Sequence, residues 1–555
     1  MRNIISYHIL LMLTLFSVFN TRLVKAQNEV HIFPDRSYCV SGDTLWFSTL
    51  IISENQKKTS NVVHVQLDNS NNRHITKVSV LCNENQGQGY IPIPDSLSTG
   101  TYFLKAFISG SINKEKVTIN QRLLTVYNRF DEDLNVINKQ KTEKTLSYEQ
   151  TKSINISTDS ESIGTRENLK GEIQITANAQ TNLSALFVFA GMEDPSSENN
   201  ISQFFPVLKN GKSVTPYSVI EKNGVLVNGK VISQEENTPV SGAIVLLSIP
   251  DSIPYLDYCI SDSTGNFCFY LRNAIGIGNL VIQARSFQYP HCEIKLFDNY
   301  IETKETQEPE LVQFTYDQKI FAEAVVNASY FNKFFTIYRP AESNQFSIPV
   351  EFKYPIYGEP TTTVYPELFI DLPNFTEISR ELLHGVLYRE RKDGTSIRMY
   401  NYGGEEVFRE EPLKLLDGIP VFDAKVFSKM RTTDIQRVDE IFYERFIGDL
   451  SFQGVLAVYS HKQSLSWIEH APGISLFSYP CLQVPKSWSL TGVTYAKPNI
   501  PDFRRVLYRN KFKNIKPENE FTLTSSDMKG NLSITVIAIT KQNEILYTGK
   551  QIEVK

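Results

Sequence analysis

The stretch HIFPDRSYCVSGDTLWFSTLI, residues 31–51, combines two local signals that recur along this chain. Gly42-Asp43 is a turn signal, because both residue types adopt turn conformations at low cost. After the turn, Leu45 and Phe47 alternate with Trp46. A side-chain period of two is typical of a strand, whose successive residues point to opposite faces of a sheet. The stretch therefore predicts a turn followed by a strand.

Alternating runs of the same kind occur elsewhere, over residues 61–67, 102–108, 171–176 and 531–539. Aromatic residues make up 12% of the chain, and Gly, Asn, Asp and Pro separate the runs. Aromatic and β-branched residues favour strands, and a period of two suits sheets that stack as sandwiches. We expect a mainly β, multidomain protein with several β-sandwich domains and one small α/β domain.

Length and charge narrow the class of protein. The chain has 555 residues, which suggests three or four domains at roughly 150 residues each. Hydrophobic residues make up 41% and charged residues 21%, which is ordinary for globular protein and excludes wholesale disorder. The formal net charge of -5 disfavours nucleic acid as a partner, because binding to phosphates needs a basic face.

The N-terminus indicates export. A short positive start precedes a mostly apolar run from Ile4 to Phe19, and Val24-Lys25-Ala26 supplies small residues for cleavage. This pattern is typical of a secretory signal peptide over residues 1–26. The alternative is an uncleaved anchor helix, although the apolar run is shorter than the roughly 20 residues that a span needs. We expect no transmembrane segment in the mature chain.

Cysteines are sparse and form no metal-binding spacing. The six cysteines include no CxxC pair, so a zinc ribbon or a thioredoxin-type site has no support. Cys259 and Cys268 flank an expected hairpin with the turn Asp262–Gly265. In an oxidising compartment they form either a disulfide or two small, half-buried thiols.

The first block, residues 28–128, resembles the macroglobulin-type β-sandwich domain of alpha-macroglobulins. Asp35-Arg36, Tyr38, Gly42-Asp43 and Trp46 fill the places of that family's pattern, and residues 89–107 match its closing hairpin. Residues 150–222 resemble a second copy. The family's thioester string Cys-Gly-Glu-Gln is absent from this sequence, so covalent capture of proteases is not implied.

Residues 223–297 resemble the carboxypeptidase regulatory-like β-sandwich. VNGKVISQEENTPVSGAIVLL, residues 227–247, precedes SDSTGNFCFYL, residues 261–271, as the family pattern requires. Domains of this family are scaffolds, and the name implies no peptidase.

Residues 366–465 resemble the plug domain of TonB-dependent outer-membrane transporters. The family pattern places a Pro-Leu pair before Leu-Asp-Gly-Val-Pro-Val, then a helix, a strand and a closing Gly-Val strand. The matching residues here are Pro412, Leu416, Asp417, Gly418, Pro420, Val421, Arg437, Gly448 and Gly454. Glu440 stands where the family usually has valine, which weakens the central strand. Read from the residues alone, this block is strand, turn, helix, strand and strand.

A transporter continues from its plug into a barrel. Residues 463–555 are too few for the roughly 22 strands of such barrels, so we expect no transporter. Residues 298–365 are expected as a connecting β segment, and residues 466–555 as a C-terminal β segment.

No motif for catalysis, a cofactor or a metal is recognised. The eight histidines form no HxxxH or HExxH spacing, and no GxSxG occurs. Asp35 and Asp43 form either an acid pair or, more simply, a partner of Arg36 and a turn residue. The basic stretch at residues 504–513 either contacts lipid or glycan, or guards a solvated β edge.

These observations predict a non-enzymatic, exported binding or scaffold protein of the bacterial cell envelope. We expect it in the periplasm, or associated with the outer membrane at the cell surface, with an outer-membrane or surface protein or a glycan as partner. Sandwiches present loops and strand edges for such recognition. The alternatives are an accessory to a TonB-dependent transporter, acting through the plug-like block, and a cell-surface hydrolase with an unfamiliar site.

Overall fold

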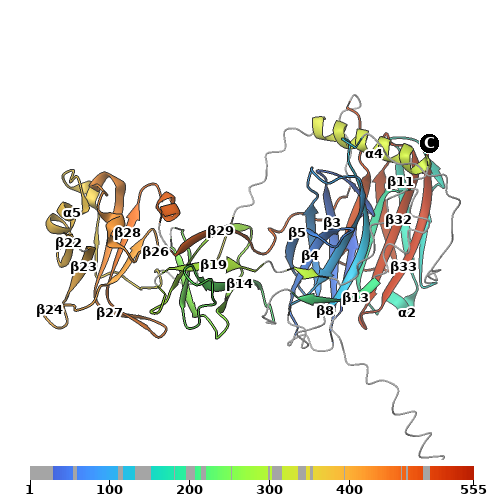
Figure 1. Cartoon of the computed structure of the whole chain (residues 1–555). Coiled ribbons are helices and arrows are strands. Elements are labelled where there is room, and N and C mark those ends of the chain that lie inside the picture. Colours follow the sequence, from blue (N-terminus) through green and yellow to red (C-terminus); the bar gives the residue numbers. More distant parts are fainter. Residues whose placement is uncertain are drawn as a thin grey trace, which may run out of the picture. The chain divides into compact units, whose positions relative to one another are not determined.

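The computed structural model describes residues 29–555 except 54–58, 110–116, 132–151, 181, 195–206, 214–219, 252, 290, 298–299, 303–315, 336–345, 350–353, 393, 464, 471–472 and 492–499. The expected signal peptide lies outside the described residues. The chain forms two compact units: unit 1 from residues 1–222, 300–342 and 485–555, and unit 2 from residues 223–299 and 343–484. Both units are built mainly from strands, which confirms the expected mainly β fold (Figure 1).

Unit 1 begins with a β-sandwich of two sheets. One sheet has the order β1 (Glu29–Pro34), β3 (Thr44–Ile52), β6 (Gln86–Pro92). The other has the order β20 (Ile301–Glu302), β13 (Val207–Ser213), β8 (Val117–Tyr127), β7 (Gly100–Phe107), β4 (Val62–Asn69), β5 (His74–Leu81), with β2 (Tyr38–Val40) beside β8. Leu45 and Phe47 lie in the core between these sheets, and Gly42 turns with a φ of 81°. The turn and strand expected in residues 31–51 are therefore confirmed.

Unit 1 contains a second sandwich, assembled from distant parts of the chain. Its sheets have the orders β31 (Glu518–Thr524), β11 (Asn168–Ile175), β9 (Ile154–Thr158), and β10 (Ser162–Ile163), β33 (Ile545–Val554), β32 (Gly530–Thr540), β12 (Leu183–Met192), β30 (Val506–Phe512). The short helix α2 (Ala177–Gln180) joins β11 to β12. The segments 150–222 and 466–555, which the sequence analysis separates, thus share both sheets.

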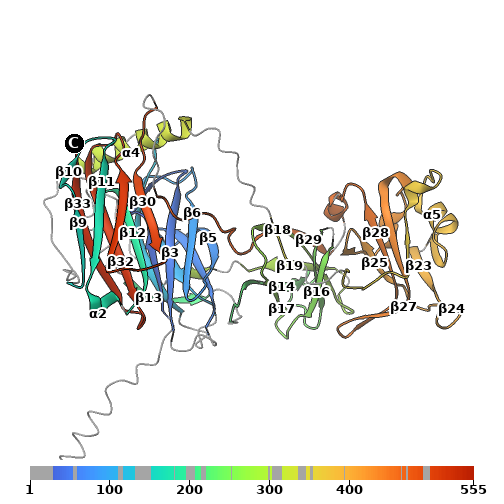
Figure 2. The ribbon, with the colours of Figure 1, turned by 180° about the vertical axis from the view of Figure 1, so that it is seen from behind.

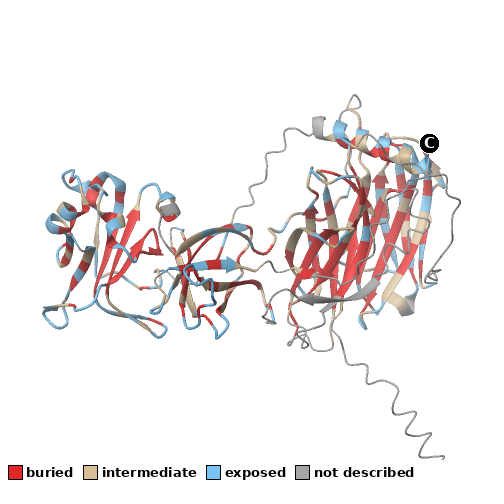
Figure 3. Ribbon diagram, in the orientation of Figure 1, coloured by how far each residue is buried: buried red, intermediate tan, exposed pale blue. Residues whose placement is uncertain are grey.

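The two sandwiches of unit 1 pack against each other through apolar outer faces. Phe33 of β1 and Leu50 of β3 join Phe187 and Phe189 of β12 in one buried cluster with Trp488. Phe187 and Phe189 both meet the Trp488 ring edge-on, with centroids 5.9 and 5.6 Å away. The strands of both sandwiches are accordingly mostly buried, as Figure 3 shows.

The segment expected as a connecting β segment contains a long helix. Helix α4 (Tyr316–Phe335) covers one end of the strands of unit 1, where both ribbon views place it (Figures 1 and 2). Ala322, Val325 and Ala328 form its buried stripe and pack against Tyr38 and Met192. A spacing of three residues puts these side chains on one helical face, which is why the segment is helical and not β. Among the described helices of the chain, none has the length and apolar character needed to cross a membrane.

Unit 2 starts with a smaller sandwich. Its sheets have the orders β17 (Asn266–Arg272), β14 (Gly224–Ser233), β19 (Cys292–Leu296), and β16 (Tyr255–Ile260), β15 (Ile244–Ile249), β18 (Ile277–Arg285), β29 (Ile474–Pro480). Strand β29 comes from the C-terminal segment, after the plug-like block. β16 and β17 are consecutive in the chain but lie at the edges of different sheets.

The plug-like block follows in unit 2. Its main sheet has the order β21 (Thr362–Val364), β27 (Ile435–Ile447), β28 (Leu450–Ser460), β25 (Leu413–Leu416), β26 (Ile419–Pro420). A second sheet has the order β22 (Val386–Arg391), β23 (Gly394–Asn401), β24 (Glu406–Val407). Helical elements are α5 (Phe375–Glu381) and the 3-10 turns η2 (Pro366–Leu368), η3 (Ala424–Phe427), η4 (Thr432–Asp434) and η5 (Ser466–His470). The helix expected after Val421 is thus a short 3-10 turn.

Candidate functional site

Asp35 and Asp43 belong to a charged cluster in the interior of unit 1. We call Asp35, Arg36, Asp43, Arg505 and Arg509 the buried ion cluster. Arg509 Nη1 donates to Asp35 Oδ2 at 2.5 Å, and Arg505 Nη1 lies 2.7 Å from Asp43 Oδ2. Arg36 lies 3.4 Å from Asp35 and 3.7 Å from Asp43. Each carboxylate therefore has arginine partners, and the two do not form an acid pair.

Asp43 also closes its own turn. Its Oδ2 accepts a hydrogen bond from the Val40 amide at 2.8 Å, and its Oδ1 accepts one from Ser329 of α4 at 3.1 Å. Burial alone would raise the pKa of Asp43, but Arg505, Arg36 and the Val40 amide together hold it below its usual value. The carboxylate is thus fixed in its charged form as a structural group.

The basic stretch at residues 504–513 is largely turned inward. Strand β30 lies at the edge of its sheet, yet Arg509 is only 5% exposed and lies over the rings of Trp46 and Trp488, at 4.6 and 5.5 Å. Arg504 pairs with Asp502 at 2.7 Å. Since Arg505 and Arg509 serve the buried ion cluster, they are unavailable to lipid or glycan.

The plug-motif residues lie in and around the main sheet of the plug-like block. Pro412 comes directly before β25 and Leu416 ends it, and both are buried, as are Pro420 and Val421 after the turn. Asp417 has a φ of 51° and accepts hydrogen bonds from the amide and hydroxyl of Ser460, both at 2.7 Å. These residues therefore fasten the turn between β25 and β26 to the end of β28.

Two motif glycines allow the plug-like block to approach the sandwich closely. A Cβ on Gly418 would lie 2.1 Å from Pro254 Cβ, and one on Gly448 would lie 2.2 Å from the hydroxyl of Tyr258. The Asp449 amide donates to that hydroxyl at 2.8 Å. Pro254 precedes β16 and Tyr258 belongs to it, so this contact runs along an edge strand of the sandwich. The third motif glycine, Gly454, has a φ of 91°, and a Cβ there would lie 2.9 Å from the Ile441 carbonyl.

Arg437 holds part of a polar network that fixes the connecting segment. Its guanidinium lies 3.9 Å from the centroid of the Tyr459 ring and 3.4 Å from Asp439. Asp439 accepts from the Tyr357 hydroxyl at 3.0 Å, which also meets the Tyr459 hydroxyl at 2.5 Å. Arg445 Nε donates to the Tyr357 carbonyl at 3.2 Å. The position of Tyr357 is therefore set by the plug-like sheet.

Glu440 lies on the opposite face of the same strand. It is 1% exposed, and its Oε1 has no hydrogen-bond partner among the described residues. Its cross-strand neighbour is Leu456, which belongs to the apolar core of the plug-like block. Burial raises the pKa of Glu440 to about 8, so the carboxyl is largely protonated at neutral pH.

Cys259 and Cys268 are free thiols in the structure. Cys259 pairs in register with Val245 and Cys268 with Asn228, so each faces a different sheet neighbour. Burial raises the pKa of Cys259 to about 12, which makes it unreactive. The disulfide between them stays a prediction. Across the described ranges, no three His, Cys, Asp or Glu side chains gather closely enough to hold a metal ion.

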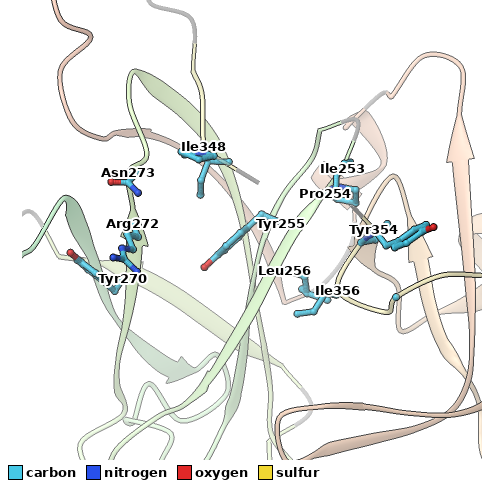
Figure 4. Close-up of a pocket in the computed structure, with 13 residues that line it drawn as sticks. Ile253, Pro254, Tyr255, Leu256, Tyr270, Arg272, Asn273, Ile348, Tyr354 and Ile356 are labelled. Atoms are coloured by element: carbon cyan, nitrogen blue, oxygen red, sulfur yellow. The ribbon is translucent and has the colours of Figure 1, made fainter. Parts of the chain in front are cut away.

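Unit 2 contains an apolar cavity of about 530 Å³ (Figure 4). This volume falls in the usual range for binding sites of roughly 300–1,000 Å³. The described residues that line it belong to the stretches 253–256, 270–273, 348–349 and 354–358. They are Ile253, Pro254, Tyr255, Leu256, Tyr270, Arg272, Asn273, Ile348, Pro349, Tyr354, Pro355, Ile356 and Gly358. We call it the unit 2 cavity.

The walls of this cavity come from the edge strands β16 and β17 and from the segment around Tyr357, which the plug-like sheet holds in place. β16 contributes Tyr255 and Leu256, and β17 contributes Tyr270 and Arg272. In Figure 4, Tyr255 projects from β16 toward the side on which β17 lies. Ile356 lies next to Tyr357 in the chain, so the network around Arg437 positions the wall that faces Leu256. The plug-motif residues therefore act on the cavity indirectly, by holding its walls.

No residue of the cavity was proposed as a site from the sequence. The available signals were the prolines at 349, 355, 360 and 366 and the nearby tyrosines, which read only as a break in strand patterning. Lining residues from separate segments meet only after the sandwich and the plug-like block have packed.

Comparisons with known proteins give distant structural likenesses. The Salmonella alpha-2-macroglobulin reacted with methylamine aligns over 96% of this chain and 40% of its own, with 8% identity and a TM-score of 0.23. The native Escherichia coli alpha-2-macroglobulin aligns over 96% and 40%, with 7% identity and a TM-score of 0.24. The adhesin InvE of Yersinia pseudotuberculosis aligns over 49% and 60%, with 10% identity and a TM-score of 0.13.

The chain thus spans about two-fifths of the length of the alpha-2-macroglobulins that it matches. At these TM-scores the matches carry no argument about family, activity or partners. No protein-family model matches the chain, and no curated protein matches it.

Proposed function

We propose that this chain is an exported, non-enzymatic binding and scaffold protein of the cell envelope, whose unit 2 recognises a protein partner. Export rests on the signal-peptide pattern of residues 1–26. The observation that carries the binding role is the unit 2 cavity, which lies at strand edges and is lined mainly by Ile, Leu, Pro and Tyr side chains. Such a lining takes apolar side chains, as interface pockets do.

A protein fits this cavity better than a glycan does. Sugars need many hydrogen-bonding groups around any ring on which they stack, because each hydroxyl that loses water must find a partner. Two of the three tyrosine hydroxyls already donate to acids, Tyr255 to Asp257 at 3.3 Å and Tyr354 to Glu359 at 3.1 Å. Their rings thus offer mainly apolar surface to the occupant.

A second candidate function is an accessory to a TonB-dependent transporter. The observation in its favour is a run of three consecutive exposed apolar side chains on the plug-like block, Leu368 at 76%, Phe369 at 57% and Ile370 at 72%. Consecutive exposed apolar residues mark contact surfaces more often than chance exposure. A separate outer-membrane barrel would contact this run.

Site-specific photo-crosslinking in the native envelope separates the two functions. A photoreactive residue is placed at Ile356 in the cavity, at Leu368 on the exposed run, or at Phe287 as a control, since Phe287 is 99% exposed and outside the cavity. We expect a discrete protein adduct from Ile356 that Phe287 does not give. A barrel protein captured from Leu368 alone would favour the accessory function, and adducts no different from those of Phe287 would contradict both.

A further inference from the structure

Among the described residues that line the unit 2 cavity, one, Arg272, carries a positive charge. Arg272 ends β17 with an exposed side chain, and the other lining residues are apolar, tyrosine, asparagine or glycine. Within the part of the chain that the structure describes, the Arg272 guanidinium has no ion-pair or hydrogen-bond partner. A cation beside a low-dielectric wall attracts an anion more strongly than one in open solvent.

Two acids accept hydrogen bonds from tyrosines of the lining. Asp257 accepts from the Tyr255 hydroxyl, and Glu359 accepts from the Tyr354 hydroxyl. Neither acid lines the cavity. The electrostatic complement of the described lining residues is therefore a negative charge on an otherwise apolar occupant.

The backbone around the cavity points to an extended peptide. Among the described strands, β16 pairs only with β15 and β17 pairs only with β14, so each is an edge strand of its sheet. Edge strands carry unpaired N–H and C=O groups that an extended peptide satisfies by adding a strand. The cavity borders the start of β16, at Tyr255 and Leu256, and the end of β17, at Tyr270 and Arg272. Further along β16 the plug-like block contacts Tyr258, so the peptide would pair with these strand ends, where the apolar pocket is within reach of its side chains.

We propose that the unit 2 cavity takes an extended, apolar peptide segment that carries a carboxylate, and that Arg272 pairs with this carboxylate. The inference rests on the proposed function and adds the chemistry of the partner segment. The guanidinium is planar and matches a carboxylate with two parallel hydrogen bonds, which a primary amide or an ammonium group cannot accept.

A competition among peptide pools tests the charge requirement. The pools are N-acetylated pentapeptide amides with four positions drawn from valine, threonine, leucine and phenylalanine and the fifth fixed as glutamate, glutamine or lysine. They are mixed in equal amounts and passed over the immobilised full chain, and retained peptides are quantified by mass spectrometry. We expect the glutamate pool to be retained about threefold more than the glutamine pool, and the lysine pool least, as for a partly exposed ion pair.

Variants assign this preference to one residue. Arg272→Gln is expected to equalise the glutamate and glutamine pools, and Arg272→Glu is expected to favour lysine. Lys295→Gln removes an exposed cation from β19 of the same sandwich, outside the cavity, and should leave the preference unchanged. Ile356→Trp fills an exposed lining position and should reduce retention of every pool.

The outcomes separate the inference from the proposed function. Equal retention of the three pools, with all three reduced by Ile356→Trp, would overturn the carboxylate requirement and leave peptide binding in the cavity standing. A preference for glutamate that Lys295→Gln abolishes as fully as Arg272→Gln would also overturn the inference, because general charge would then explain it. Absence of retention of every pool, or retention unaffected by Ile356→Trp, would contradict both.

Discussion

Glu440 is a single residue whose protonation is coupled to the folding of unit 2. Its pKa is about 8 in the folded chain against an ordinary value of 4.5. Because the folded state holds the proton more tightly, the free energy of unfolding is greatest below pH 4.5 and falls as the pH rises toward 8, by up to about 1.4 kcal/mol per pH unit. Glu440→Gln keeps the shape and removes the charge, so we expect it to raise the stability of unit 2 at pH 8 and not at pH 4.

Denaturant unfolding at several pH values measures this effect. Glu444→Gln is the matched control, because Glu444 is exposed on the same strand. If the stability of unit 2 depends on pH in the same way in the wild-type protein and in the Glu440→Gln variant, Glu440 is not a buried, protonated carboxyl in the folded chain.

Single residues also show where sequence reasoning stops. Asp35 and Arg36 are neighbours, and their pairing was foreseeable. Arg509 is 474 positions away from Asp35 and was read only as part of an exposed basic stretch. The sequence shows that a residue is charged. Whether its side chain is buried depends on which strand the fold places opposite to it. The partner of a buried charge therefore needed the structure.

The turn between β25 and β26 needs a glycine at position 418 because of one close contact with Pro254. Gly418 has a φ of 82°, and a Cβ there would meet Pro254 at 2.1 Å. Gly418→Ala is expected to lower the stability of unit 2 through both backbone strain and this clash, by about 2–4 kcal/mol. Gly358→Ala is the matched control, because Gly358 has a φ of 84° and nothing lies within 4 Å of its Cβ position.

Chemical denaturation of the two variants isolates the contact. Since both positions carry the same backbone strain, the difference between the variants measures the approach of the plug-like block to the sandwich. Equal losses of stability would mean that the clash with Pro254 is relieved at no cost.

Strands were predictable from the sequence, and their partners were not. The alternation in residues 171–176 correctly indicates a strand, but β11 pairs with β31, more than 300 residues later. Residues 89–107 were expected as a hairpin, yet β6 pairs with β3 and β7 with β4 and β8. A side-chain period of two shows which residues of a strand point to the same face of the sheet, but it does not show which strand pairs with it. The unit 2 cavity was missed for the same reason, because its walls belong to separate segments.

At the scale of the whole molecule, the chain divides into two units with separate cores. Each buried apolar cluster of the described residues draws its members from one unit, such as the cluster around Trp488 in unit 1 and the cluster around Phe442 in unit 2. Unit 1 is nevertheless assembled from three stretches of chain. Two hydrogen bonds from β4 join separate parts of unit 1. His64 pairs with Glu221 at 2.6 Å, and Gln66 donates to the Ile301 carbonyl at 2.9 Å.

Separate cores imply that the two units unfold in separable transitions, since cooperativity follows shared packing. Arg509→Gln removes the closer of the two arginines that pair with the buried Asp35 and leaves only Arg36 at 3.4 Å, so it should lower the transition of unit 1 alone, by about 3–5 kcal/mol. Lys513→Gln, at an exposed position of the same basic stretch, should change it by less than about 0.5 kcal/mol. Differential scanning calorimetry of these variants beside Glu440→Gln assigns each transition. One transition that both Arg509→Gln and Glu440→Gln displace would show that the units fold as one body, because a stability change in either core would then be shared by the whole chain.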